Sequence, residues 1–154
     1  MAGTFSQIYI QVVFAVNGRQ GLINQVWEED LYKYITGIVR NKEQKMLAIN
    51  GMPDHIHMLI GMRPSCCLSD LVREVKKSST NYIRNNLSLQ HDFNWQEGYG
   101  TFSYSTSSLD SVIRYIGNQK SHHKKQTFRD EYISFLNQFQ IEYKNEFLFD
   151  FNNL

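Results

Sequence analysis

Residues 52–62 of the chain read MPDHIHMLIGM, and this stretch decides the predicted fold. Its run of apolar and β-branched residues, held between two prolines, predicts a short strand that begins at His55. Residues two apart on a strand point to the same face of a sheet, so His55 and His57 share one face. Ile56 and Met58 then point to the opposite face, where we expect a core covered by helices.

The segments on either side of this strand predict three more strands and four helices. Runs of β-branched and aromatic residues indicate strands, and apolar residues at helical spacing behind a capping residue indicate helices. The expected strands are residues 8–16, 45–50, 55–62 and 101–105. The four expected helices begin at the capping residues Asn24, Ser69, Ser107 or Ser108, and Thr127. The first of these helices is expected to end near Lys42, and the third near Lys125.

The resulting order, β-α-β-β-α-β-α-α, predicts an α+β fold of the ferredoxin-like type. This fold is a split βαβ with an antiparallel sheet of about four strands and helices on one face. The C-terminal helices, which carry Tyr115, are additions to the minimal fold. We expect residues 1–154 to form a single domain.

Length and composition agree with one packed domain. The chain has 154 residues, of which 42% are hydrophobic and 20% are charged, so a sizeable core is possible and global disorder is not expected. No apolar run approaches the length of a membrane span, and the first residues do not resemble a signal peptide. Cys66 and Cys67 are adjacent and unsuited to an ordinary disulfide, which predicts a reduced, cytoplasmic protein without a membrane partner.

The net charge of +1 conceals an uneven distribution along the chain. The segment 114–129 carries five bases and no acid, and the segment 73–84 carries four bases and one acid. Residues 130–154 carry five acids and one base. Two basic segments beside an acidic one indicate a localised surface for a polyanion, with solvated helix faces as the alternative.

Two pairs of side chains could perform chemistry. His55 and His57 can share a divalent ion, or they can be two histidines on a half-exposed sheet face. Tyr115 and Gln119 are four residues apart and therefore lie on one face of the third predicted helix. The alternative for this pair is a tyrosine that covers the edge of the core and a solvated glutamine.

Taken together, the two pairs suggest phosphodiester chemistry. Two imidazoles and a glutamine carbonyl can hold one divalent ion and leave positions open for a phosphate oxygen. A tyrosine beside that ion is a candidate nucleophile, although its phenol needs activation. The phosphotyrosine ester conserves the energy of the broken bond, so rejoining needs no ATP. The sequence also has no Walker-type phosphate loop, and we expect no nucleotide cofactor.

Several motifs in this order resemble one known family. Residues 52–60 (MPDHIHMLI) and 115–123 (YIGNQKSHH) are similar to the His-x-His and Tyr-x-x-x-Gln signatures of the HUH single-tyrosine transposases. Further similarity lies at residues 17–19 (NGR), 68–73 (LSDLVR) and 95–105 (WQEGYGTFSYS). The family includes transposases of small single-strand insertion sequences and the REP-associated tyrosine transposases.

This resemblance implies a role for each matching residue. Tyr115 would be the nucleophile that forms a 5′-phosphotyrosine. His55, His57 and Gln119 would hold Mg²⁺ or Mn²⁺. The substrate would be single-stranded hairpin DNA, and the protein would be a homodimer in which the tyrosine helix can complete the partner's site in trans.

Binding such DNA requires lysine or arginine side chains that neutralise the phosphates. It also requires aromatic side chains that stack on unpaired nucleobases. Trp95 and Tyr99 are candidates for stacking, or else they cap the core. The candidate DNA-binding residues are Arg73, Lys76, Lys77, Arg84, Lys120 and Lys124, with Lys125 and Arg19 as additions.

Two other functions compete with this interpretation. A domesticated relative that binds hairpins as a regulator would share the fold and bind DNA without cutting it. A metal phosphodiesterase with paired His-x-Thr/Ser motifs would need a second motif, which the sequence lacks.

The resemblance assigns no role to three further features. Gly117 is either a hinge in the tyrosine helix or a site of close packing. His122 and His123 are expected to be a solvated helix end rather than ligands. The aromatic, acidic residues after Asn137 are expected to cover the core or contact a second protomer.

Overall fold

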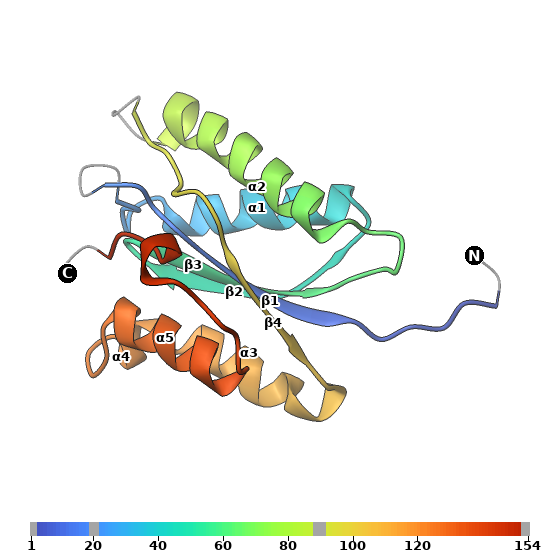
Figure 1. The fold of residues 1–154 in the computed structure, drawn as a ribbon. Helices are drawn as coiled ribbons and strands as arrows, with labels where there is room; N and C mark the ends of the chain where they lie inside the picture. Colours follow the sequence, from blue (N-terminus) through green and yellow to red (C-terminus); the bar gives the residue numbers. More distant parts are fainter. Residues whose placement is uncertain (1–2, 19–21, 88–91, 152–154) are drawn as a thin grey trace.

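The computed structural model of the chain describes residues 3–18, 22–87 and 92–151. Figure 1 shows a single sheet with helices above and below it. The elements are β1 (Tyr9–Ala15), α1 (Glu28–Asn41), β2 (Lys45–Met52), β3 (His55–Gly61), α2 (Leu68–Tyr82), β4 (Gly100–Tyr104), α3 (Leu109–Gly117), α4 (Gln119–His122) and α5 (Phe128–Gln138).

The sheet has the strand order β2-β3-β1-β4, and every neighbouring pair is antiparallel. With α1 and α2 as the two crossovers, this is the ferredoxin-like split βαβ predicted from the sequence. Strands β1 and β3 lie in the centre, and Val13 and Ala15 of β1 stand opposite His57 and His55 of β3. The predicted histidine strand is therefore an interior strand.

One face of the sheet forms the main apolar core against α1 and α2. Alternate residues of β3 contribute Ile56, Met58 and Ile60, all fully buried. They pack with Leu31 of α1 and Val75 of α2, among other side chains. The prediction that Ile56 and Met58 point into a helix-covered core is confirmed.

The other face is covered as well, by the C-terminal helices (Figure 1). Helix α3 packs Val112 and Ile116 against Leu59, and α5 packs an aromatic layer against Val13 and Phe102. His55 and His57 lie on this second face and are completely buried. The alternative of two histidines on a half-exposed face is therefore wrong, because the extra helices bury the face.

A tight β2–β3 hairpin places His55 at the start of its strand. Met52 pairs with His55, and Gly51 pairs with Ile56. A Cβ on Gly51 would collide with the backbone carbonyl oxygen of His55, so this close approach requires glycine. The turn lies at residues 53–54, later than the expected Gly51-Met-Pro turn, and β2 is correspondingly longer.

Of the four predicted helix starts, two are correct and two are wrong. Ser108 is the N-cap residue of α3, as one of the two expected alternatives, although its side chain makes no capping hydrogen bond. Thr127 caps α5, because its hydroxyl oxygen accepts the backbone N–H of Asp130 at 3.1 Å. Helix α1 begins at Glu28, since Asn24 instead accepts the N–H of Val26 in a local turn ahead of the helix. Helix α2 begins at Leu68, one residue before the expected cap at Ser69.

The third predicted helix does not run unbroken to Lys125. It ends at Gly117, and Asn118 separates it from the short helix α4. Asn50 of β2 donates from its amide to the carbonyl oxygens of Ile116 and Gly117, at 3.1 and 3.2 Å, which occupies acceptors at the end of α3. Across the described part of the chain, no helix is both long and apolar enough to cross a bilayer.

Candidate metal and tyrosine site

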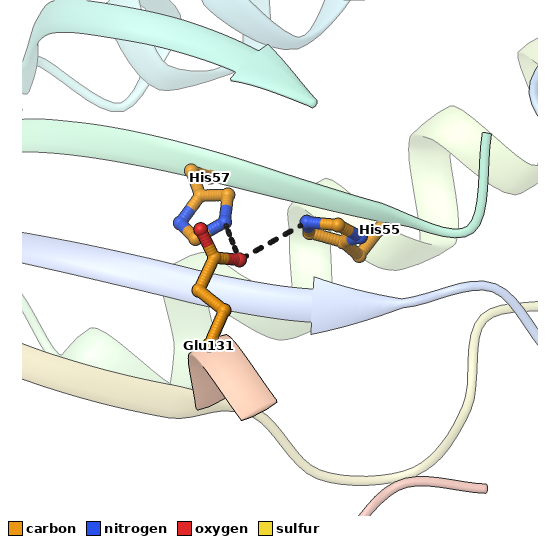
Figure 2. A group of neighbouring side chains, drawn as sticks. All are labelled: His55, His57 and Glu131. Carbon is orange, nitrogen blue, oxygen red and sulfur yellow. Dashed lines mark hydrogen bonds and ion pairs between the residues drawn. The ribbon is translucent and has the colours of Figure 1, made fainter. Parts of the chain in front are cut away.

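The two histidines of β3 present their Nε2 atoms toward a common point under α5. Figure 2 shows both rings turned toward the carboxylate of Glu131. His57 Nε2 lies 3.0 Å from Glu131 Oε1, and His55 Nε2 lies 3.4 Å from the same oxygen. One ligand atom from each of the three residues lies within 4.8 Å of the others, and all three residues are buried.

A second layer of polar groups holds each ring from behind. His55 Nδ1 lies 2.7 Å from Asp54 Oδ1, which fixes this ring with Nε2 toward the site. His57 Nδ1 lies 2.8 Å from the Gln11 amide, whose oxygen accepts the hydroxyl of Tyr104 at 2.7 Å. A carboxylate that accepts the N–H behind the ring is a usual way in which proteins orient histidine ligands of metals, and Asp54 occupies this position behind His55.

Tyr115 and Gln119 reach the same point from the other direction. The Tyr115 hydroxyl donates a short hydrogen bond to Glu131 Oε2. The fully buried Gln119 donates from Nε2 to the same oxygen at 3.2 Å. The four residues predicted from spacing, His55, His57, Tyr115 and Gln119, are therefore gathered around one carboxylate.

That carboxylate was not predicted from the sequence. Glu131 is 2% exposed, and it lies in the first turn of α5, just after the Thr127 cap. Its only sequence signal was membership of the acidic segment, which gave no reason to single out one residue. The Thr127 cap fixes where α5 begins, and the apolar side of this helix faces the sheet. Together, these two signals could have indicated that Glu131 in the first turn points inward.

His122 and His123 also belong to the site, and the expectation of a solvated helix end is wrong. His123 Nε2 lies 3.2 Å from Glu131 Oε1 and 3.2 Å from Gln119 Oε1. The ring of His122 stacks on Tyr115 with centroids 4.3 Å apart. Both imidazoles therefore lie within the site, His122 on the Tyr115 ring and His123 beside Glu131.

Burial and neighbouring charges shift the pKa values of these groups in definite directions. Burial alone would raise the pKa of Glu131, but the adjacent imidazoles of His123, His55 and His57 hold that pKa well below the usual range. Burial, reinforced by the Glu131 carboxylate, raises the pKa of Tyr115 above that of an ordinary phenol.

The pKa values of the two histidines on β3 shift in opposite directions. Burial lowers the pKa of His57. The same burial acts on His55, but Asp54 and Glu131 outweigh it and raise the pKa of His55. Glu131 is thus a carboxylate at neutral pH, and Tyr115 is a neutral phenol.

These residues fit a divalent metal ion. His55 Nε2 is fully buried and has no hydrogen-bond partner among the described residues, since its contact with Glu131 lacks hydrogen-bond geometry. A buried, unpartnered imidazole nitrogen that faces a second imidazole and a carboxylate is a suitable metal ligand. His55, His57 and either Gln119 or Glu131 could supply the ligand set.

A cavity of about 380 Å³ opens beside Tyr115, between α3 and α5. Hydroxyl and amide side chains line much of it, and no lysine or arginine is among the described residues at its wall. These polar side chains are Ser108, Ser111, Ser134, Gln126 and Gln138. Tyr115 and the Glu131 carboxylate therefore line a polar cavity that has no basic side chain among its described wall residues.

Three of the predicted DNA-binding residues make contacts within the protein. Lys76 Nζ donates to the carbonyl oxygens of Gln96 and Gly98, at 2.8 and 2.6 Å, and burial lowers the pKa of Lys76 to about 8. Arg84 donates to the Phe93 carbonyl oxygen at 2.9 Å. Lys120 bridges Glu28 of α1 and the carbonyl oxygen of Gly51.

The other candidates lie in contact with solvent. Lys77 and Lys124 are exposed, and Arg73 is an exposed partner of Asp70 three residues away. Arg19 lies outside the described residues. Figure 1 shows α2 and α4 on opposite faces of the sheet, so the two basic segments do not lie on one helix layer.

The remaining features take definite places. Trp95 is 9% exposed, packs on Phe14 and donates to Ser79, so it belongs to the core, whereas Tyr99 is 36% exposed. A Cβ on Gly117 would meet nothing within 4 Å, which excludes close packing as the reason for glycine there. Phe149 of the aromatic tail is buried against α5, as expected for core cover.

Comparison with known proteins identifies one matching family. The family described as IS200-like transposases matches residues 4–119, a stretch that includes the histidine pair, Tyr115 and Gln119 but ends before Glu131. No curated protein matches the chain in sequence.

Two solved structures share the fold. One is a chain assigned as a transposase in Deinococcus radiodurans R1, with 20% identity and a TM-score of 0.61, covering 77% of this chain and 95% of that one. The other is a REP-associated tyrosine transposase bound to a REP hairpin, with 17% identity and a TM-score of 0.59, covering 75% of this chain and 68% of that one. Since the family match spans most of the chain and includes both motifs, the chain belongs to the family of IS200-like transposases.

Proposed function

We propose that this transposase cleaves and rejoins single-stranded hairpin DNA through a 5′-phosphotyrosine on Tyr115. The observation that carries the proposal is the convergence of Tyr115, Gln119 and the His55–His57 pair, from opposite parts of the sequence, on one buried point. Hairpin DNA is proposed as the substrate because a REP-associated tyrosine transposase of the same fold was solved with a REP hairpin.

Each residue has a task in this reaction. The Tyr115 oxygen attacks the scissile phosphorus, which forms a phosphotyrosine and releases a 3′-hydroxyl; the reverse attack by a 3′-hydroxyl rejoins DNA. His55, His57 and Gln119 would hold Mg²⁺ or Mn²⁺, which when bound would polarise the phosphate and favour the phenolate. The polar cavity beside Tyr115 would admit the DNA that flanks the cleaved bond.

Exposed lysine and arginine side chains would bind the phosphates of the hairpin. Lys77 and Lys124 are exposed to solvent and could do so as they stand, whereas the exposed Arg73 would first have to leave its ion pair with Asp70. Lys76, Arg84 and Lys120 would first have to release their contacts within the protein, so their role in DNA binding is the more demanding part of the proposal.

A covalent adduct tests the reaction. Single-stranded oligonucleotides from the ends of the protein's own genomic locus are incubated with the protein and Mg²⁺ or Mn²⁺. A protein–DNA band is then expected on a denaturing gel. Tyr115→Phe should abolish the band, and Tyr143→Phe, at an exposed tyrosine outside the site, should retain it. Hairpin binding without any band would instead identify a binding protein that acts as a regulator.

A homodimer is part of the proposal, and the position of Tyr115 bears on how its sites are built. In the structure, Tyr115 meets the histidine pair of its own chain through Glu131. We therefore propose a tyrosine that acts in its own protomer, with transfer to the partner's site as the alternative.

A further inference from the structure

We propose that Glu131 is a ligand of the divalent ion through Oε1 and holds the nucleophilic Tyr115 through Oε2. This inference rests on the proposed function, because it adds a carboxylate to the predicted ligands His55, His57 and Gln119. Glu131 lies beyond the residues that the family match covers.

The first argument concerns the charge of the ligand set. Two imidazoles and a glutamine carbonyl are all neutral, so they supply no charge to offset a dication. Mg²⁺ and Mn²⁺ are hard ions that proteins bind preferentially through carboxylate oxygens. Glu131 supplies such a carboxylate, since its Oε1 lies 3.4 Å from His55 Nε2 and 3.0 Å from His57 Nε2.

The second argument concerns the cost of burying Glu131. A carboxylate that is 2% exposed requires compensation by positive charge or by several hydrogen bonds. Within residues 3–18, 22–87 and 92–151, no lysine or arginine forms an ion pair with it; its partners are three imidazoles, a phenol and an amide. Imidazole nitrogens and a carboxylate around one point form a suitable environment for a metal cation.

The third argument is the division of labour between the two carboxylate oxygens. Oε1 faces the histidine nitrogens, and Oε2 accepts the Tyr115 hydroxyl and the Gln119 amide (Figure 2 shows the histidine side). One side chain therefore connects the metal position to the nucleophile. With Oε2 holding the phenol, the attacking oxygen stays beside the ion that polarises the phosphate.

The packing of α5 keeps the carboxylate in this position. The ring of Phe128, three residues earlier, stacks on His55 with centroids 3.8 Å apart and planes 2° apart. Phe135, four residues later, contacts both the Tyr115 and the His57 rings. Aromatic contacts one turn before and one turn after Glu131 thus fix the depth at which it enters the site.

Manganese binding to the full-length protein tests this assignment without DNA. Mn²⁺ is titrated into the wild type and into Glu131→Gln, and bound ion is measured by electron paramagnetic resonance. We expect Glu131→Gln to weaken Mn²⁺ binding at least tenfold. Asp130→Asn, which removes an exposed charge from the same first turn, should bind as the wild type does and controls for the helix N-terminus.

Further variants separate the possible failures. Glu131→Asp keeps the charge but shortens the side chain, so its affinity should fall between wild type and Glu131→Gln, and far-UV circular dichroism checks that each variant folds. Equal or tighter Mn²⁺ binding by folded Glu131→Gln would overturn the assignment. It would show that the Glu131 side chain takes the place of the ion between the histidines instead of binding it. His57→Ala should lose binding in every case; Mn²⁺ binding that survives this change would overturn the metal site of the proposed function itself.

Discussion

At the scale of single residues, the site depends on side chains that do not touch the reacting atoms. Asp54 holds His55, and the Gln11–Tyr104 pair holds His57, so each imidazole has one nitrogen fixed and one directed at Glu131. Residues of this kind determine how ready the site is to receive an ion, because a free ring would have to be ordered on binding.

Asp54→Ala should therefore weaken metal binding while leaving the fold intact. We expect the affinity for Mn²⁺ to fall by about 10–100-fold, the usual effect of removing the group behind a histidine ligand. A Mn²⁺ titration of the variant measures this loss, with Asp92→Ala, an exposed aspartate far along the chain, as the control. Wild-type affinity in Asp54→Ala would show that the hydrogen bond to His55 does not orient a ligand.

The sequence allowed four of the central residues to be predicted and concealed the fifth. His55 and His57 follow from strand alternation, and Tyr115 and Gln119 follow from helical spacing, because each pair is local in the sequence. Glu131 meets them only through tertiary packing of α5, for which the sequence contains no distance information. His123 was missed for the same reason, since the turn after Gly117 determines which way α4 faces.

At the scale of elements, the break between α3 and α4 is the most consequential departure from prediction. The spacing of apolar residues predicted one continuous helix, but the helix ends at Gly117 and Asn118. The Asn50 amide donates hydrogen bonds to the last carbonyl oxygens of α3. The strands were predicted to within a few residues because alternation and β-branching are strong local signals. The cap at Asn24 was misplaced because its side chain accepts the N–H of Val26 in a local turn, whereas α2 has Cys67 at its N-cap, two residues before Ser69.

Gly117→Ala should stabilise the protein and join the two helices more firmly. The added Cβ meets no atom within 4 Å, and alanine loses less backbone entropy on folding than glycine. We expect the free energy of unfolding in urea to rise by about 0.5–1 kcal/mol. If the break is a hinge used in each reaction cycle, adduct formation should slow in the same variant; a lower stability would show that Gly117 relieves a strain that the contacts do not reveal.

Helix α2 offers a direct test of the DNA surface. Lys77 is exposed, whereas its neighbour Lys76 is bonded to the 96–98 loop. Lys77→Ala should weaken hairpin binding and reduce the slope of log affinity against log salt by about 1, as expected for one lost phosphate contact. Lys144→Ala, at an exposed lysine in the acidic segment, is the control; an unchanged slope in Lys77→Ala would remove this residue from the interface.

At the scale of the whole molecule, helices cover both faces of the sheet, but the side chains buried on the two faces differ in polarity. The face under α1 and α2 is almost entirely apolar and supplies the core. The face under α3, α4 and α5 contains apolar clusters around a buried polar centre. The ferredoxin-like part could be predicted because it repeats a known order of elements, whereas the docking of the C-terminal helices on the second face could not.

Mixing two inactive variants tests whether one chain builds a complete site. Since Tyr115 meets the histidines of its own chain, a mixture of Tyr115→Phe and His57→Ala should form no covalent adduct. The measurement is the same denaturing gel, after the two proteins have been incubated together long enough to exchange subunits. An adduct on the His57→Ala chain would show that the tyrosine acts in the partner's site.

The two halves of the site are far apart in the order of synthesis. The histidines are made early, on β3, whereas Tyr115, Gln119 and Glu131 come from the last third of the chain and meet them only when α3, α4 and α5 dock on the sheet. A growing chain therefore contains all four strands of the sheet before Glu131 and the rest of α5 have been synthesised. Under the proposed mechanism, the nucleophile and the metal position come together only after α5 has been made and has packed on the sheet.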